Sequence, residues 1–186
     1  MHCKRSLVLP INKKYLRLTV LQSTQVLLLG LDFAGKTTLI GRLRYDRVIQ
    51  AMPTNNPQSH NIKVGNCTLK TFDMGGHKTA RKLWKEYMVD LDGIIFMIDA
   101  ADRMRFSEVK KQLLGLLDEP LIHDVPFLVL ANKVDIPTAA SREELKTVLG
   151  LHGHEGSETK KFRMEMCSII KESGYPEGIQ WLVSQI

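Results

Sequence analysis

The amino-acid sequence predicts an α/β protein with a six-stranded, mostly parallel sheet and helices on both faces. Three observations lead to this fold class. The chain has 186 residues, enough for one domain with its own core, and 44% of them are hydrophobic against 25% charged. Short apolar runs alternate with segments of helical periodicity. A glycine-rich turn with a lysine joins the first apolar run to the first helix.

The expected elements follow one another in an alternating order. Strands are expected at residues 25–29, 60–64, 67–73, 93–98, 127–130 and 162–167. The runs at 25–29, 93–98 and 127–130 are continuously apolar, which is typical of parallel strands covered on both faces. The helices are expected at residues 36–45, 106–117, 141–149 and 178–186. Gly65-Asn66 predicts a tight hairpin between the second and third strands. Ser141 and Glu144 form a capping-box signature at the start of the third helix.

Most of the net charge of +6 lies at the N-terminus. The first 22 residues hold five cations and no acid, which leaves +1 for residues 23–186. We therefore divide the chain into a basic, partly apolar segment, 1–22, and a domain, 23–186. Two interpretations of the segment stay open: contact with an anionic membrane surface, or a frayed lead into the first strand. The near-neutral domain argues against nucleic acid as a partner.

Targeting and cysteine signals are few. No apolar run reaches the ~20 residues that cross a bilayer. The three cysteines lie far apart, so neither a disulfide framework nor a zinc site is expected, and a reducing compartment is favoured.

Residues 30–37, GLDFAGKT, match the phosphate-binding pattern G-x-x-x-x-G-K-[ST] between a strand and a helix. The glycines let backbone N–H groups face phosphates, and the start of the helix adds its positive end. Lys36 would place a cation on the β- and γ-phosphates, and Thr37 would offer a hydroxyl to Mg²⁺. The other interpretation is a plain glycine-rich turn. The nucleotide-binding residues predicted here are Asp32, Ala34, Gly35, Lys36, Thr37 and Thr38.

A second group of candidates lies around D-M-G-G-H, after the strand 67–73. Asp73 at the strand end would hold Mg²⁺ through water, and the Gly76 N–H would reach a γ-phosphate. His77 either orients the attacking water or is a surface loop histidine. Thr54 gains a role in Mg²⁺ coordination only from the motifs around it. Lys36, Gly76 and His77 are therefore the candidate catalytic residues, and Thr37, Thr54 and Asp73 the candidate metal ligands.

The motif N-K-V-D at residues 132–135 predicts a base-binding loop after the strand 127–130. The Asp135 carboxylate matches the paired donors of guanine, whereas adenine would leave it unpaired. Asn132 is suited to tie this loop to the phosphate loop, and the stem of Lys133 to cover one face of the base. A backbone N–H of Cys167-Ser168 is a candidate donor to the guanine O6, although Cys167 also fits a plain buried cysteine.

These motifs together resemble the Ras-like small GTPases, and within them the Arf/Sar branch. The stretches that carry the resemblance are GLDFAGKT, MPT, DMGGH, NKVD and MCS, in this order. Three details are similar to Sar-type members: His77 after the glycine pair, ARKLWKEY at 80–87, and GYPEG at 174–178 followed by Trp181. The likeness covers the chain from about residue 25 to its end.

The resemblance implies a P-loop small-GTPase fold that binds GTP or GDP with Mg²⁺ and acts as a cytoplasmic switch, monomeric in solution. For a Sar-type member it implies recruitment of the COPII inner coat to the endoplasmic reticulum and Golgi membranes, with a coat subunit as the activating partner. It also implies a membrane-bound exchange factor and membrane contact through residues 1–22. Because no arginine is evident near the predicted phosphate site, hydrolysis without a partner is expected to be slow.

Three alternatives stay open. One is an Arf-like GTPase that serves another membrane. Another is a GTP-binding scaffold that does not hydrolyse its nucleotide. The third is an ATP-dependent P-loop enzyme.

Overall fold

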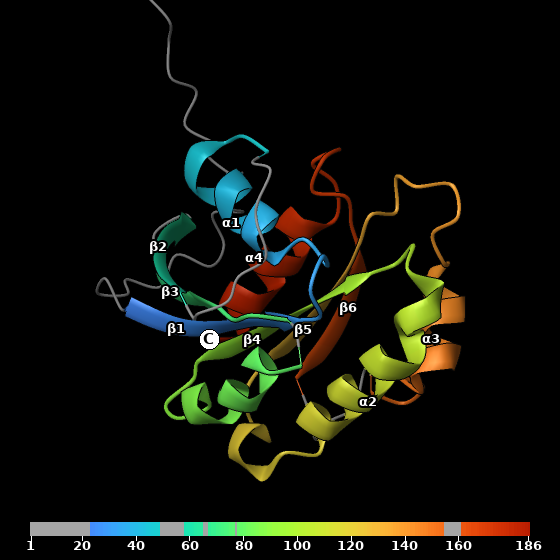
Figure 1. Ribbon diagram of the computed structural model, residues 1–186. Helices are drawn as coiled ribbons and strands as arrows, with labels where there is room; N and C mark the ends of the chain where they lie inside the picture. Colours follow the sequence, from blue (N-terminus) through green and yellow to red (C-terminus); the bar gives the residue numbers. More distant parts are fainter. Residues whose placement is uncertain (1–22, 49–57, 65–66, 77, 155–160) are drawn as a thin grey trace, which may run out of the picture.

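The computed structural model describes residues 23–48, 58–64, 67–76, 78–154 and 161–186 (Figure 1). The N-terminal segment, the hairpin turn at Gly65-Asn66, Thr54 and His77 lie outside the described residues. No helix in the described ranges is both long and apolar enough to cross a bilayer.

The described residues form one six-stranded sheet in the order β2-β3-β1-β4-β5-β6. Five strands run parallel, and β2 pairs antiparallel with β3, as the hairpin signal predicts. The central strands are apolar because helices cover both of their faces. The strands are β1 Ser23–Gly30, β2 Gln58–Val64, β3 Cys67–Asp73, β4 Gly93–Asp99, β5 Phe127–Asn132 and β6 Phe162–Met166. The predicted fold class is confirmed.

Helices lie on both faces of the sheet (Figure 1). On one face, α1 (Lys36–Tyr45) and α4 (Tyr175–Gln185) pack with Val26 and Leu28 of β1. On the other, α2 (Phe106–Leu117) and α3 (Arg142–Leu149) pack with Leu27 and Leu29. Alternate side chains of one strand therefore enter two separate apolar layers, each closed by its own pair of helices.

Helix starts agree with the sequence where a local signal is strong. The helices predicted at 36–45 and 106–117 have these bounds, and the Ser141 side chain accepts the Glu144 N–H as the capping box predicts. The last helix begins at Tyr175, three residues before the predicted start, because Pro176 suits the first turn of a helix. The described residues also contain three 3₁₀ segments that the sequence analysis did not predict: η2 Ala80–Tyr87, η3 Arg103–Arg105 and η4 Pro120–Ile122. The last two have only three residues each, too few to show a helical period.

The parallel strands end together at one edge of the sheet. Asp73 ends β3, and it pairs in register with Leu28 of β1. Asp99, the last residue of β4, pairs in register with Asn132, the last residue of β5. The carboxyl ends of such strands are where α/β sheets bind ligands, so the chemically notable residues meet at this edge.

Candidate nucleotide-binding site

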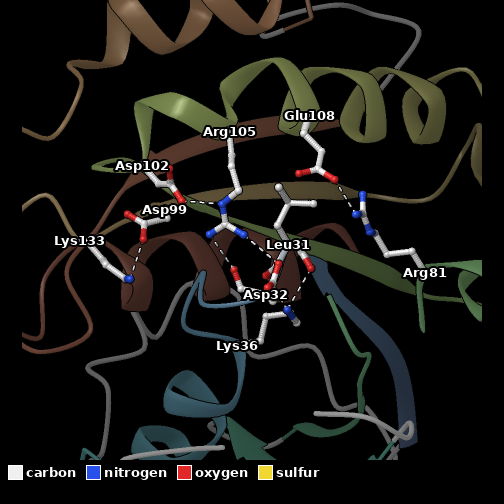
Figure 2. A network of polar contacts seen from close by, with 10 residues as sticks. Leu31, Asp32, Lys36, Arg81, Asp99, Asp102, Arg105, Glu108 and Lys133 are labelled. Atoms are coloured by element: carbon white, nitrogen blue, oxygen red, sulfur yellow. Dashed lines mark hydrogen bonds and ion pairs between the residues drawn. The ribbon is translucent and has the colours of Figure 1, made fainter. Parts of the chain in front are cut away.

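Lys36 is the buried cation of the phosphate loop. Its ammonium group donates to the main-chain oxygens of Gly30 at 2.9 Å and Leu31 at 2.8 Å, and the residue is only 6% exposed (Figure 2). Burial lowers the pKa of Lys36 from 10.5 to about 8, although the carboxylates of Asp73 and Asp32 act in the opposite direction. The main-chain carbonyls of the loop therefore hold the Lys36 ammonium group in place before an anion binds.

Gly35 and Asn132 join the phosphate loop to the base loop. The Asn132 side-chain amide donates to the Ala34 oxygen at 3.0 Å, and its oxygen accepts the Ile169 N–H at 3.2 Å. Gly35 has φ of 103°, and a Cβ there would lie 2.4 Å from the Asn132 amide nitrogen. Only glycine fits this turn and this contact. The predicted tie between the two loops is confirmed.

Thr37 and Asp73 bring two oxygen ligands together. Asp73 is fully buried at the end of β3, and its carboxylate accepts the Thr37 hydroxyl at 2.7 Å. Hydroxyl and carboxylate oxygens are the hard donors that Mg²⁺ prefers, and the ion usually keeps its other positions for water and phosphate oxygens. The pair therefore fits the predicted magnesium site. Its predicted third ligand, Thr54, lies outside the described residues.

The segment after β3 packs directly on the phosphate loop. A Cβ at Gly76 would lie 2.1 Å from the Asp32 nitrogen, so only a glycine allows this approach. The buried Trp84 of η2 donates its indole N–H to the Gly75 oxygen at 3.1 Å. Trp84 thus holds Gly75 on one side, and Gly76 packs against the phosphate loop on the other.

The base loop carries its acid at the surface. The Asp135 carboxylate is exposed and accepts the hydroxyl of the buried Ser168 at 2.5 Å. Lys133 has φ of 70°, and its ammonium group forms an ion pair with Asp99 at 2.6 Å (Figure 2). Of the predicted base-binding residues, Asn132, Lys133, Asp135 and Ser168 lie together at this corner.

The sequence model of the ADP-ribosylation factor family matches residues 12–186 of this chain. The chain belongs to the Arf family of small GTPases. The P-loop, the six-stranded sheet and the Asn-Lys-x-Asp loop are thus the parts of an Arf-family protein, a family that binds guanine nucleotides.

Individual relatives within the Arf family differ in their named roles. The small COPII coat GTPase SAR1 of Giardia intestinalis is 39% identical, covering 84% of this chain and 86% of that protein. The small COPII coat GTPase SAR1 of Nicotiana tabacum is 34% identical, and the match covers 89% of this chain and 90% of that protein. ADP-ribosylation factor-like protein 3 of Caenorhabditis elegans is 37% identical, and the match covers 87% of each chain. Among solved structures, the Arl6 BBS3 small GTPase of Trypanosoma brucei with the nucleotide analogue GppNp has a TM-score of 0.78 and 31% identity, over 88% of this chain and 96% of that one.

Cys167 and Ser168 of this Arf-family chain differ from one detail of the sequence prediction. The Cys167 N–H donates to Ala131 at 2.8 Å, and the Ser168 N–H donates to Ser173 at 3.0 Å. Both groups are engaged within the chain because the first continues the β5–β6 pairing and the second closes a turn. Cys167 is fully buried, and burial raises the pKa of its thiol to about 12. It matches the plain buried cysteine, and Ser168 acts here through its hydroxyl.

Arg105 departs from the sequence expectations. The expectation of no arginine near the phosphate site was wrong, because Arg105 contacts Asp32 of the phosphate loop. The Asp102 side chain also accepts from Arg105, at 2.5 Å, and makes no capping hydrogen bond to η3. Arg105 and Asp32 are 73 residues apart, and the D-x-x-R spacing of Asp102 and Arg105 was the one local signal.

Proposed function

We propose that this Arf-family protein is a Sar-type GTPase, which hydrolyses GTP with Mg²⁺ and recruits the COPII inner coat to the endoplasmic reticulum membrane. The similarity to the Giardia small COPII coat GTPase, at 39% identity, carries the proposal. The ARKLWKEY stretch at 80–87 supports it, because it is similar to the corresponding stretch of Sar-type members.

In the proposed reaction the chain supplies mainly charge and position. Lys36 would leave its carbonyl partners for the β- and γ-phosphate oxygens, and the Gly76 N–H would face the γ-phosphate. Thr37, Thr54 and Asp73 would hold Mg²⁺, which neutralises phosphate charge when bound. His77 would orient the attacking water. Asn132, Lys133 and Asp135 would hold the guanine.

Hydrolysis by the protein alone is expected to be slow. All three guanidinium nitrogens of Arg105 already donate to Asp102 or Asp32, so this arginine is not placed to stabilise charge on the γ-phosphate. A coat subunit would supply that charge in trans, and a membrane-bound exchange factor would reload GTP. Residues 1–22 would contact the membrane through their cations and apolar side chains.

A single-turnover assay tests the proposal. The GTP-loaded protein is mixed with anionic vesicles, with or without purified COPII inner coat subunits, and released phosphate and vesicle-bound coat are measured. We expect GTP-dependent coat binding and faster phosphate release with the coat. Coat binding that is equal with GDP and GTP would contradict the COPII assignment. Absence of phosphate release in both arms would favour the non-hydrolysing scaffold.

A second candidate is an Arf-like GTPase that serves another trafficking step. The 37% identity with ADP-ribosylation factor-like protein 3 favours it, since this value is close to that of the SAR1 relative. In the same assay this candidate predicts normal GTP binding, no coat recruitment and no acceleration by coat subunits.

A further inference from the structure

Arg105 reaches from η3, at the start of α2, to the phosphate loop (Figure 2). Its Nε donates to the Asp102 carboxylate at 2.5 Å. Its two Nη atoms donate to Asp32, one to the carboxylate at 2.8 Å and one to the main-chain oxygen at 3.2 Å. Each guanidinium nitrogen thus has a protein acceptor, and the side chain grips the loop at two points.

The bond to the Asp32 carbonyl sets the direction of a peptide group. The described residues contain no cis peptide bond, and in a trans peptide the C=O and N–H point to opposite sides. With its C=O turned to Arg105, the peptide directs the Phe33 N–H away from Arg105. The backbone N–H groups of this motif cradle phosphates, so the bond orients one of those donors.

Phe33 shows that the turn needs outside support. Its φ is 62°, in the left-handed region that bulky residues avoid, and its side chain is 64% exposed. Such a conformation persists where the surrounding structure imposes it. Packing of the Phe33 ring does not supply this constraint, because the ring is exposed. The Ala34 N–H, which donates to the Leu31 oxygen at 3.4 Å, and Arg105, which donates to the Asp32 oxygen, both hold the backbone on either side of it.

Charge gives Arg105 a second task. Asp32 puts a carboxylate on the phosphate loop itself, where a bound polyphosphate would be repelled. The Arg105 guanidinium forms an ion pair with this carboxylate at 2.8 Å and so reduces the repulsion. Asp102, three residues before Arg105, holds the guanidinium from the other side, so its direction is fixed.

We infer that Arg105 is a positioning residue, which orients the phosphate loop at Asp32 and offsets the charge of that carboxylate, and so slows nucleotide release. This inference rests on the proposed binding of a guanine nucleotide at the loop. Arg105 acts through the loop and does not contact the phosphates.

Arg103 offers a matched control on the same 3₁₀ turn. It donates to the Thr138 oxygen at 3.0 Å and forms an ion pair with Glu144, on the side of α3. The two arginines therefore differ in whether they contact the phosphate loop, and glutamine at either position removes one positive charge.

The test measures release of a fluorescent GDP analogue from the full chain, chased with excess GDP at fixed Mg²⁺. We expect Arg105→Gln to release the analogue at least about tenfold faster than the unchanged protein, since charge-assisted bonds to the loop are lost. Arg103→Gln is expected to stay within about twofold. The double variant Asp32→Asn with Arg105→Gln is expected to be slower than Arg105→Gln, because it removes the uncompensated carboxylate.

The outcomes separate the inference from the proposed function. Equal release from Arg105→Gln and Arg103→Gln would overturn the inference. A double variant as fast as Arg105→Gln would overturn the charge role, because a purely structural contact is not restored by neutralising its partner. Should Arg105→Gln fail to fold, Arg105→Lys against Arg103→Lys tests the orienting role alone, because lysine keeps the charge but loses the paired bonds of the guanidinium to Asp32. An unchanged protein that binds neither GDP nor GTP would overturn the proposed function, and the inference with it.

Discussion

The phosphate loop and the base loop lie at the same edge of the sheet but are held in different ways. In the phosphate loop the cation is inside, because Lys36 is 6% exposed and bonded to two main-chain carbonyls. In the base loop the acid is outside, because Asp135 is exposed and held by one hydroxyl, that of Ser168. One loop is fixed before any ligand arrives, and the other presents its recognition group to solvent.

This difference assigns different tasks to the two loops. A buried, preformed cation gives strong attraction to phosphate whatever the base is. An exposed carboxylate contributes to affinity only when a ligand offers matching donors, so it discriminates between bases. Asn132 joins the two loops by hydrogen bonds, so the group that attracts phosphate and the group that selects the base are linked to each other.

The largest expected effect comes from removing the buried cation. Lys36→Met keeps the length of the side chain but loses the charge and both bonds to the loop carbonyls. We expect GDP and GTP affinity to fall by on the order of 10²–10³, measured by isothermal titration. The ratio of guanine to adenine nucleotide affinity is expected to stay unchanged in this variant. A variant with near-normal affinity would show that the loop binds phosphate without its lysine.

Asp135→Asn is expected to change selectivity more than overall binding. The amide no longer accepts both guanine donors, so the ratio of GTP to ATP affinity should fall by about a hundredfold. Competition of GTP, xanthosine triphosphate and ATP for one labelled nucleotide measures this ratio, and xanthosine triphosphate should gain. Asp124→Asn is a suitable control, because this exposed aspartate precedes the start of β5, whereas the base loop follows the end of that strand. An unchanged ratio would mean that this carboxylate does not recognise the base.

The lysine also predicts a pH dependence with a defined sign. The pKa of Lys36 in the chain alone is about 8, and phosphate would raise it, so the complex stays protonated at higher pH. Below pH 8 the affinity should be level, and above it the affinity should fall by up to about tenfold per pH unit, since binding then takes up a proton. Titrations from pH 6.5 to 9.5 measure this, with Lys36→Met expected to show no such fall.

Folding stability of the chain alone should respond to pH in the opposite sense. The unfolded lysine has a pKa near 10.5 and the folded one about 8, so the unfolded state holds more protons between these values. The contribution of Lys36 to stability therefore rises with pH across this window and is constant below it.

Features carried by short-range signals could be predicted from the sequence, and side-chain pairs across the chain could not. The helix at 36–45 and the cap at Ser141 depend on neighbouring residues. The link from Arg105 to Asp32 depends on two loops that only the sheet topology brings together. Asn132 was predictable in spite of its long-range bond, because the Asn-Lys-x-Asp motif carries that information. The state of the Cys167 N–H was not, since it depends on how far the β5–β6 pairing extends.

The smallest expected effect concerns the backbone of the phosphate loop. Phe33 has φ of 62°, which a bulky side chain adopts at a cost of about 1 kcal/mol, whereas asparagine tolerates it. Because the ring is 64% exposed, its removal gives up little buried area. We expect Phe33→Asn to raise the free energy of unfolding by about 0.5–1 kcal/mol relative to Phe33→Ala, measured by urea denaturation. Equal values for the two variants would show that a φ of 62° costs alanine no more than asparagine at this position.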